Sequence, residues 1–96
     1  QFCTWLSDGD PSAGSRITAF ARLFDEGHPV AGATMKVQWS FPYPASVRRC
    51  ETDTGPDGVA ACTEDVPPYE CQDCFVLITI THRGWPNQRQ IRFRIH

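Results

Sequence analysis

The sequence has no apolar run that approaches the ~18 residues a membrane helix needs, and it has no surplus of positive charge. We therefore expect no direct membrane insertion. The formal net charge of −2 at pH 7 argues against a nucleic-acid partner, because phosphate binding favours a basic surplus. A charged segment followed by an apolar one is also missing. We expect any export signal to have been removed or to lie outside this fragment.

Helical periodicity is missing as well, and an alternation with a period of two residues takes its place. In 33–41 every second residue is apolar, which predicts a half-buried strand. In 75–81 apolar residues occupy both faces of the expected strand, which is typical of a central strand. In 90–96 the arginines occupy the outward positions, which is typical of an edge strand. Turns rich in glycine and proline separate such segments. We predict seven strands, at 2–7, 15–24, 33–41, 47–53, 58–64, 74–82 and 89–96.

Seven short strands in 96 residues, separated by regular turns, are typical of an antiparallel β-sandwich. The length is that of one domain, and such a chain can bury about two-thirds of its unfolded surface. We therefore expect residues 1–96 to form a single all-β domain with one modest core, in which Trp39 is buried. We also expect this domain to be monomeric.

Two segments resemble motifs of bacterial Ig-like domains. Residues 24–37 (FDEGHPVAGATMKV) are similar to the family's D-x-x-G-x-P-V-x-G-A-x-V stretch, and residues 52–60 (TDTGPDGVA) to its T-D-x-x-G-x-A hairpin with inserted residues. Such domains occur in invasin- and intimin-type adhesins and as accessory modules on other exported bacterial proteins. The resemblance implies a seven-stranded Ig-like sandwich in which 25–32 leads the chain into the other sheet. Trp39 matches the buried Trp of Ig sandwiches, but the second expected strand has no cysteine for the antibody-type disulfide.

Five cysteines are many for a chain of this length, and such a density is typical of an oxidising compartment. We therefore expect a secreted or cell-surface protein. Cys50 and Cys62 lie in the fourth and fifth expected strands. If these strands pair as a hairpin around Pro56, the two cysteines face each other in a cross-strand disulfide. Closing a loop of this length stabilises a fold by on the order of 3 kcal/mol.

Cys71 and Cys74 form a C-x-x-C pair with more than one interpretation. Redox chemistry normally requires such a pair at a helix N-terminus, and a structural zinc site requires two further ligands that the sequence does not supply. We favour a disulfide between these two residues, or a bond from one of them to Cys3. Because the cysteine count is odd, at least one thiol is free or intermolecular, and Cys3 is the first candidate.

No pattern of residues indicates catalysis. The serines have no G-x-S-x-G context, and the turn carboxylates lack EF-hand spacing, so we expect no enzyme activity, cofactor or metal. Exposed aromatic residues at loop tips are good contact anchors. Trp85 in the last expected turn and Tyr43 between two prolines are such residues, and His28 is a further candidate for a binding loop. Trp85 could equally fold back onto the end of the sandwich.

These observations favour a non-catalytic Ig-like structural or binding module of a secreted or cell-surface bacterial protein. Its partners would be neighbouring domains and a protein or glycan ligand. One alternative is an accessory domain on an exported hydrolase, which flanking sequence would identify. A second alternative is a small zinc- or redox-active protein that uses Cys71 and Cys74, which reactive thiols or bound zinc would identify.

Overall fold

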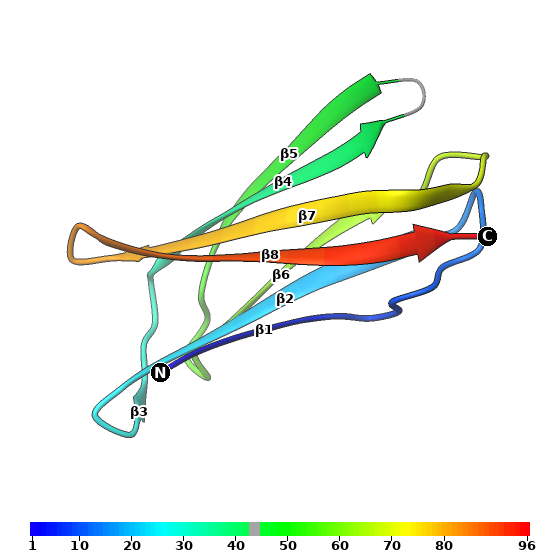
Figure 1. The fold of residues 1–96 in the computed structure, drawn as a ribbon. Coiled ribbons are helices and arrows are strands. Elements are labelled where there is room, and N and C mark those ends of the chain that lie inside the picture. Colours follow the sequence, from blue (N-terminus) through cyan, green and yellow to red (C-terminus); the bar gives the residue numbers. More distant parts are fainter. Residues whose placement is uncertain (43–44) are drawn as a thin grey trace.

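The computed structural model describes residues 1–42 and 45–96, which form eight strands in two antiparallel sheets (Figure 1). The strands are β1 (Phe2–Leu6), β2 (Arg16–Asp25), β3 (His28–Pro29), β4 (Thr34–Pro42), β5 (Ala45–Asp53), β6 (Val59–Asp65), β7 (Cys71–His82) and β8 (Trp85–Ile95). One sheet has the order β1-β2-β6, with β3 beside the end of β2, and the other has the order β5-β4-β7-β8. Within the described residues no helix is long and apolar enough to cross a membrane.

The predicted all-β antiparallel architecture is confirmed, and each predicted strand overlaps an observed one. The differences lie at strand ends. β3 is an additional strand of two residues. β8 begins at Trp85 rather than at residue 89, because β7 and β8 pair without interruption from Phe75–Arg92 to His82–Trp85. Pro86 is compatible with this pairing because β8 is an edge strand, where a missing N–H can face solvent.

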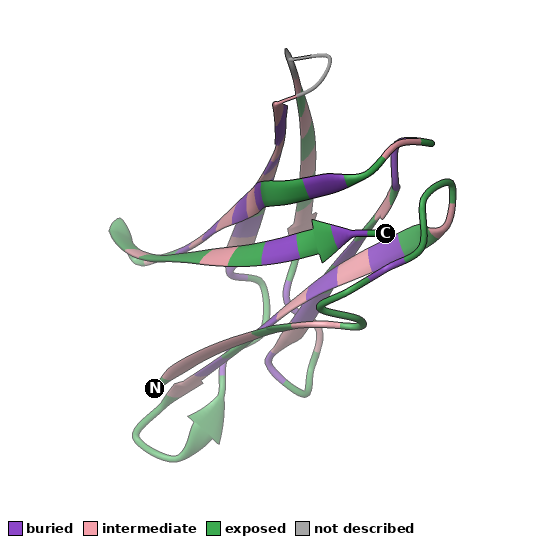
Figure 2. Ribbon diagram, turned by 45° about the vertical axis from the view of Figure 1, so that its right-hand side comes forward, coloured by how far each residue is buried: buried purple, intermediate pink, exposed green. Residues whose placement is uncertain are grey.

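The core lies between the two sheets and is built by the alternation of each strand (Figure 2). β4 confirms the pattern predicted for 33–41, since its inward residues are at most 2% exposed. Trp39 is fully buried and meets the ring of Phe93 on β8 edge-on, with 5.9 Å between ring centroids. Its predicted role as a core residue is confirmed. The inward residues of β4 are Met35, Val37, Trp39 and Phe41.

The outer face of the β1-β2-β6 sheet carries two half-buried phenylalanines of β2, at positions that alternate with the buried residues of that strand. Phe20 stacks on Trp5 of β1 with the ring centroids 5.3 Å apart. The guanidinium of Arg22 lies over the ring of Phe24, 4.7 Å from its centroid. The apolar side chains on this face are therefore covered in part by their neighbours on the same sheet.

The predicted hairpin between the fourth and fifth expected strands is wrong. β5 pairs with β4, and β6 pairs with β2, so these two consecutive strands belong to different sheets. Residues 54–58 lead the chain across one edge of the sandwich. A turn rich in glycine and proline fits a hairpin and a crossing equally well, because both reverse the chain.

Thr54 connects this crossing to the one that leads from β3 to β4. Its buried hydroxyl donates to the carbonyl oxygen of Val30 at 2.6 Å and accepts from the N–H of Ala33 at 2.9 Å. Its backbone N–H donates to the Ala33 carbonyl, and its own carbonyl accepts from the N–H of Gly32. One threonine thus satisfies backbone groups of both crossings away from water.

We expect Thr54→Val to lower the free energy of unfolding by about 1–3 kcal/mol, because the isosteric change leaves a buried carbonyl and a buried N–H without partners. Thr81→Val, at an exposed position of β7, is the matched control and should change stability by less than about 0.5 kcal/mol. Urea denaturation measures both variants. Equal effects would contradict the role assigned to the Thr54 hydroxyl.

Gly58 is held close to β2 at the end of the same crossing. Its φ is 77°, and a Cβ there would lie 2.6 Å from the carbonyl oxygen of Leu23. Gly27, in the β2–β3 turn, has nearly the same φ of 78° but no atom within 4 Å of a built Cβ. The two glycines therefore separate the cost of backbone conformation from the cost of steric contact.

We expect Gly58→Ala to destabilise the domain more than Gly27→Ala. The left-handed conformation costs a non-glycine residue about 1–2 kcal/mol at either position. Only Gly58→Ala also forces β2 and the crossing apart. Thermal or chemical unfolding of the two variants gives the difference, and a Gly27→Ala loss as large as that of Gly58→Ala would refute the close approach.

Candidate binding site

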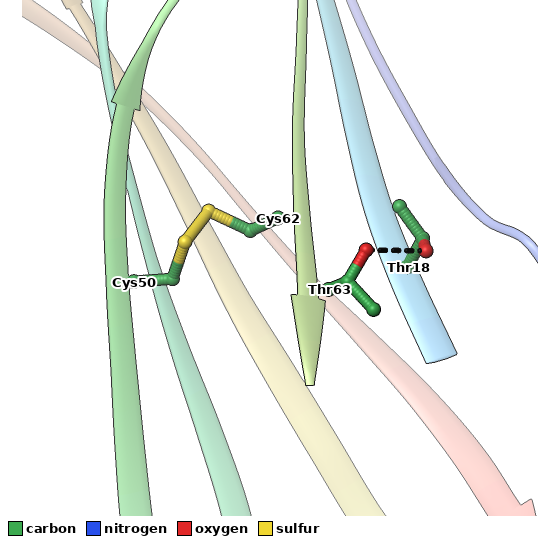
Figure 3. The surroundings of a disulfide bond; sticks show 4 residues. All are labelled: Thr18, Cys50, Cys62 and Thr63. Carbon is green, nitrogen blue, oxygen red and sulfur yellow. Dashed lines mark hydrogen bonds between the residues drawn. A yellow bond between two sulfur atoms is a disulfide. The ribbon is translucent and has the colours of Figure 1, made fainter. Parts of the chain in front are cut away.

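A disulfide joins the two sheets at the edge formed by β5 and β6 (Figure 3). It links Cys50 to Cys62 with the Cα atoms 6.2 Å apart. Cys62 is 2% exposed, and Cys50 packs against the core. On the outer side of β6, the hydroxyls of Thr63 and Thr18 are 2.8 Å apart and hydrogen-bonded. The disulfide is therefore an inter-sheet bond, which differs from the expected link across a hairpin.

Cys71 and Cys74 form a second disulfide at the start of β7. Their exposed fractions are 5% and 0%, and the β7–β8 register shifts between them. Buried sulfurs bonded to each other are not placed to react with another thiol, so this geometry fits a structural role. In residues 1–42 and 45–96, no group of three or more His, Cys, Asp or Glu could hold a metal ion. Cys3 is a free thiol, half-buried on β1.

Trp85 is held by a tight hairpin and is 77% exposed. It stands opposite His82, and the two turn residues between them, Arg83 and Gly84, have φ values of 52° and 78°. Two positive φ values are typical of the two-residue turn whose twist matches that of paired strands. Trp85 therefore lies on a strand rather than in the turn where the sequence placed it.

Trp85 lies on the same face of β8 as the residues that point into the core, but its position on the strand is beyond the end of the core. Along the same face, Ile95 and Phe93 are buried, Ile91 packs against the core, and Asn87 is half-buried. Arg89, between Ile91 and Asn87 on this face, is exposed. The face is therefore buried near the C-terminal end of β8, and it lies outside the core near the hairpin. The indole does not fold back onto the sandwich, which was the alternative left open by the sequence.

The edge between β1 and β8 is closed at one end of β8. There the N–H of Arg94 donates to the Gly9 carbonyl, and the N–H of His96 donates to the Pro11 carbonyl. Among the described residues, no backbone hydrogen bond of this kind joins β1 to β8 at the Trp85 end. The β7–β8 hairpin and the start of β1 lie at the same end of the molecule (Figure 1).

A cleft of about 440 Å³ occupies this open end. Phe2 and Leu23, which pack at the margin of the core, give it an apolar base. Trp85 and Asn87 line it from β8, and Asp25 lines it from the end of β2. The volume lies within the range of small-molecule sites, which are about 300–1,000 Å³.

The polar side chains of the cleft are not engaged by the rest of the protein. The hydrogen bonds and ion pairs within the described ranges include no side-chain contact of Asp25, His82, Arg83 or Asn87. These four side chains offer a carboxylate, an imidazole, a guanidinium and an amide. The cleft can therefore both donate and accept hydrogen bonds.

Of the other residues expected in binding loops, the structure describes His28 alone. His28 is exposed on β3 and does not line the cleft, and Tyr43 lies outside the described residues. Sequence reasoning selected Trp85 but missed Asp25 and Asn87. No local signal could have connected them, because only the packing of the two sheets brings the end of β2 to the β7–β8 hairpin.

A larger hollow of about 550 Å³ lies on the outer face of the other sheet. Lys36, Arg49 and Glu51 surround Leu77 there. Its lining has charges of both signs and no aromatic side chain, which is typical of a solvated sheet face. The cleft beside Trp85 is therefore the stronger candidate for a binding site.

No protein-family model matches this chain, and a search of curated proteins finds no match either. The site is therefore interpreted from its own geometry.

Replacing both Cys50 and Cys62 with alanine should lower the free energy of unfolding by about 3 kcal/mol, because the bond closes a loop of 12 positions. The control is Cys3→Ser, which alters a free cysteine and should change stability by less than about 0.5 kcal/mol. Denaturation under non-reducing conditions measures both. A similar small effect for the double variant would show that the inter-sheet bond contributes little.

Proposed function

We propose that this chain is a non-catalytic Ig-like module of a secreted or cell-surface bacterial protein. Its work is to hold neighbouring domains apart and to present the open end of the sandwich to a ligand. The main observation in support of this proposal is the order of the strands in the two sheets. The disulfides and the cleft at the hairpin end add support.

The division of six of the strands between the two sheets supports an Ig-type sandwich. If the short β3 is left aside, the first, second and fifth strands share one sheet, and the third, sixth and seventh share the other. Immunoglobulin domains have this division. The fourth strand, β5, lies beside the third rather than with the first sheet, where constant-type immunoglobulin domains place it. Trp39 is buried on the third strand, as in Ig sandwiches.

The cysteines support an oxidising compartment. Four of the five cysteines are joined in two disulfides, and one of these bonds connects the sheets of a domain with a modest core. Disulfides persist in secreted and cell-surface proteins and are rare where thiols are kept reduced. An exported domain would therefore retain the bond that closes its β5–β6 edge.

Several residues of the types that could carry chemistry are engaged within the fold. Cys71 and Cys74 are bonded and buried, which disfavours a redox or zinc site at this pair. Asp57 accepts a hydrogen bond from the N–H of Val59, within the crossing between the sheets. Asp65 pairs with Arg16, and Asp10 lies against His96. These contacts favour a module that binds or spaces over one that catalyses.

We expect one alkylated thiol and two disulfides when the chain is produced in an oxidising compartment and alkylated under denaturing, non-reducing conditions. Cys3→Ser is the control and should leave no reactive thiol. The protein should also not accelerate the reduction of insulin by dithiothreitol, because both sulfurs of the C-x-x-C pair are buried. Five reactive thiols with stoichiometric zinc, or an insulin reductase activity lost in Cys71→Ser, would replace this proposal with the metal or redox alternative.

A further inference from the structure

We propose that the cleft beside Trp85 binds a saccharide, with Trp85 as the platform for one pyranose ring. The inference rests on the proposed function as a binding module and names the ligand class for it. It follows from two properties of the cleft: a rigid exposed aromatic ring, and uncommitted polar side chains that both donate and accept hydrogen bonds. The residues that carry it are Trp85, Asp25, Asn87 and Arg83.

Trp85 presents a large aromatic surface at little cost in conformational entropy. The paired strands and the two-residue turn fix its backbone, and only the side-chain torsions remain to be ordered on binding. The face of an indole carries the negative part of its quadrupole. The C–H groups on one face of a pyranose ring are weakly positive and apolar, so they pack on such a surface. With 77% of the residue exposed, this surface faces solvent in the free protein.

The polar side chains of the cleft fit the hydroxyl groups of a sugar. A hydroxyl donates one hydrogen bond and accepts two, so adjacent sugar hydroxyls can use a carboxylate, an amide and a guanidinium together. Asp25 accepts, Arg83 donates, and Asn87 does both.

The shape and lining also favour a saccharide over a peptide. Aromatic-lined grooves that recognise proline-rich peptides present several aromatic surfaces. Here Trp85 is the exposed aromatic residue, Phe2 and Phe24 are half-buried, and five polar residues complete the lining of the cleft. The cleft opens to solvent, so it can accept one or two residues of a longer oligosaccharide.

The three tryptophans allow a direct test by NMR. We would record the indole N–H signals of ¹⁵N-labelled protein during titration with maltotriose, cellotriose, mannotriose and triacetylchitotriose. Each sugar is added to about 10 mM, so that a site with a Kd near 1 mM is mostly filled. We expect at least one sugar to shift the Trp85 indole and the Asn87 side-chain amide. The signals of Trp39, which is buried, and Trp5, which stacks on Phe20, should not move.

Two matched variants localise the binding. Trp85→Ala removes an exposed ring and should weaken the sugar at least about tenfold, whereas Trp5→Ala should change its affinity less than twofold. An unchanged Trp39 signal confirms that each variant is folded. Equal affinity of Trp85→Ala and the unmodified protein would overturn the proposed site.

The remaining outcomes separate this inference from the proposed function. If a proline-rich peptide shifts Trp85 and none of the sugars does, the saccharide class is wrong, and the binding module stands. If no sugar shifts Trp85, the saccharide inference is overturned, whatever the count of reactive thiols. Five reactive thiols with bound zinc would overturn the exported module independently of the titration.

Discussion

The crossing from β5 to β6 is the constraint on which the rest of the structure depends. At this edge the chain must pass from one sheet to the other, and buried backbone groups there have no strand partner. The hydroxyl and backbone of Thr54 satisfy them, and the Cys50–Cys62 bond fixes the sheets a few residues away on either side. Gly58 then allows the chain to return against β2 without a steric clash. The β5–β6 edge is thereby closed by covalent and hydrogen bonds together.

The opposite edge, between β1 and β8, is closed in a different way and only along part of its length. Beyond the end of β1, the segment that leads to β2 forms backbone hydrogen bonds with Arg94 and His96 at the end of β8. Within the described residues, no such backbone hydrogen bond joins the start of β8 to β1. A sandwich fastened in these two places leaves the corner at the start of β8 open, and the cleft lies there. The position of the candidate site is therefore a consequence of where the sheets are joined.

Much of the fold could be predicted because it depends on local periodicity. The alternation in β4 identified its buried face, and the segment of β7 with apolar residues on both faces identified a central strand. The partner of β5 could not be predicted. Cysteines at 50 and 62 fit a hairpin as well as a crossing, and the choice depends on β4, which pairs with β5 from Thr34–Asp53 to Pro42–Ala45. The pairing of β5 with β4 leaves no mark on the turn sequence at 54–58.

The candidate site was less predictable than the fold for the same reason. Trp85 could be selected because an exposed aromatic residue near a turn is informative on its own. Asp25 and Asn87 gave no signal, since an acid in a turn and an amide in a strand are ordinary features of a β protein. Their proximity arises only when β2 and the β7–β8 hairpin end at the same corner.

One face of β8 contributes both to the core and to the candidate cleft. Phe93 and Ile95 pack into the core, and Asn87 and Trp85, on the same face nearer the hairpin, line the cleft. Substitutions near the hairpin remove little buried area, whereas substitutions near the C-terminal end of β8 open a cavity. The residues that line the cleft from β8 can therefore vary without loosening the core. This separation supports the proposed binding module, because a rigid scaffold can then carry variable contacts at one corner.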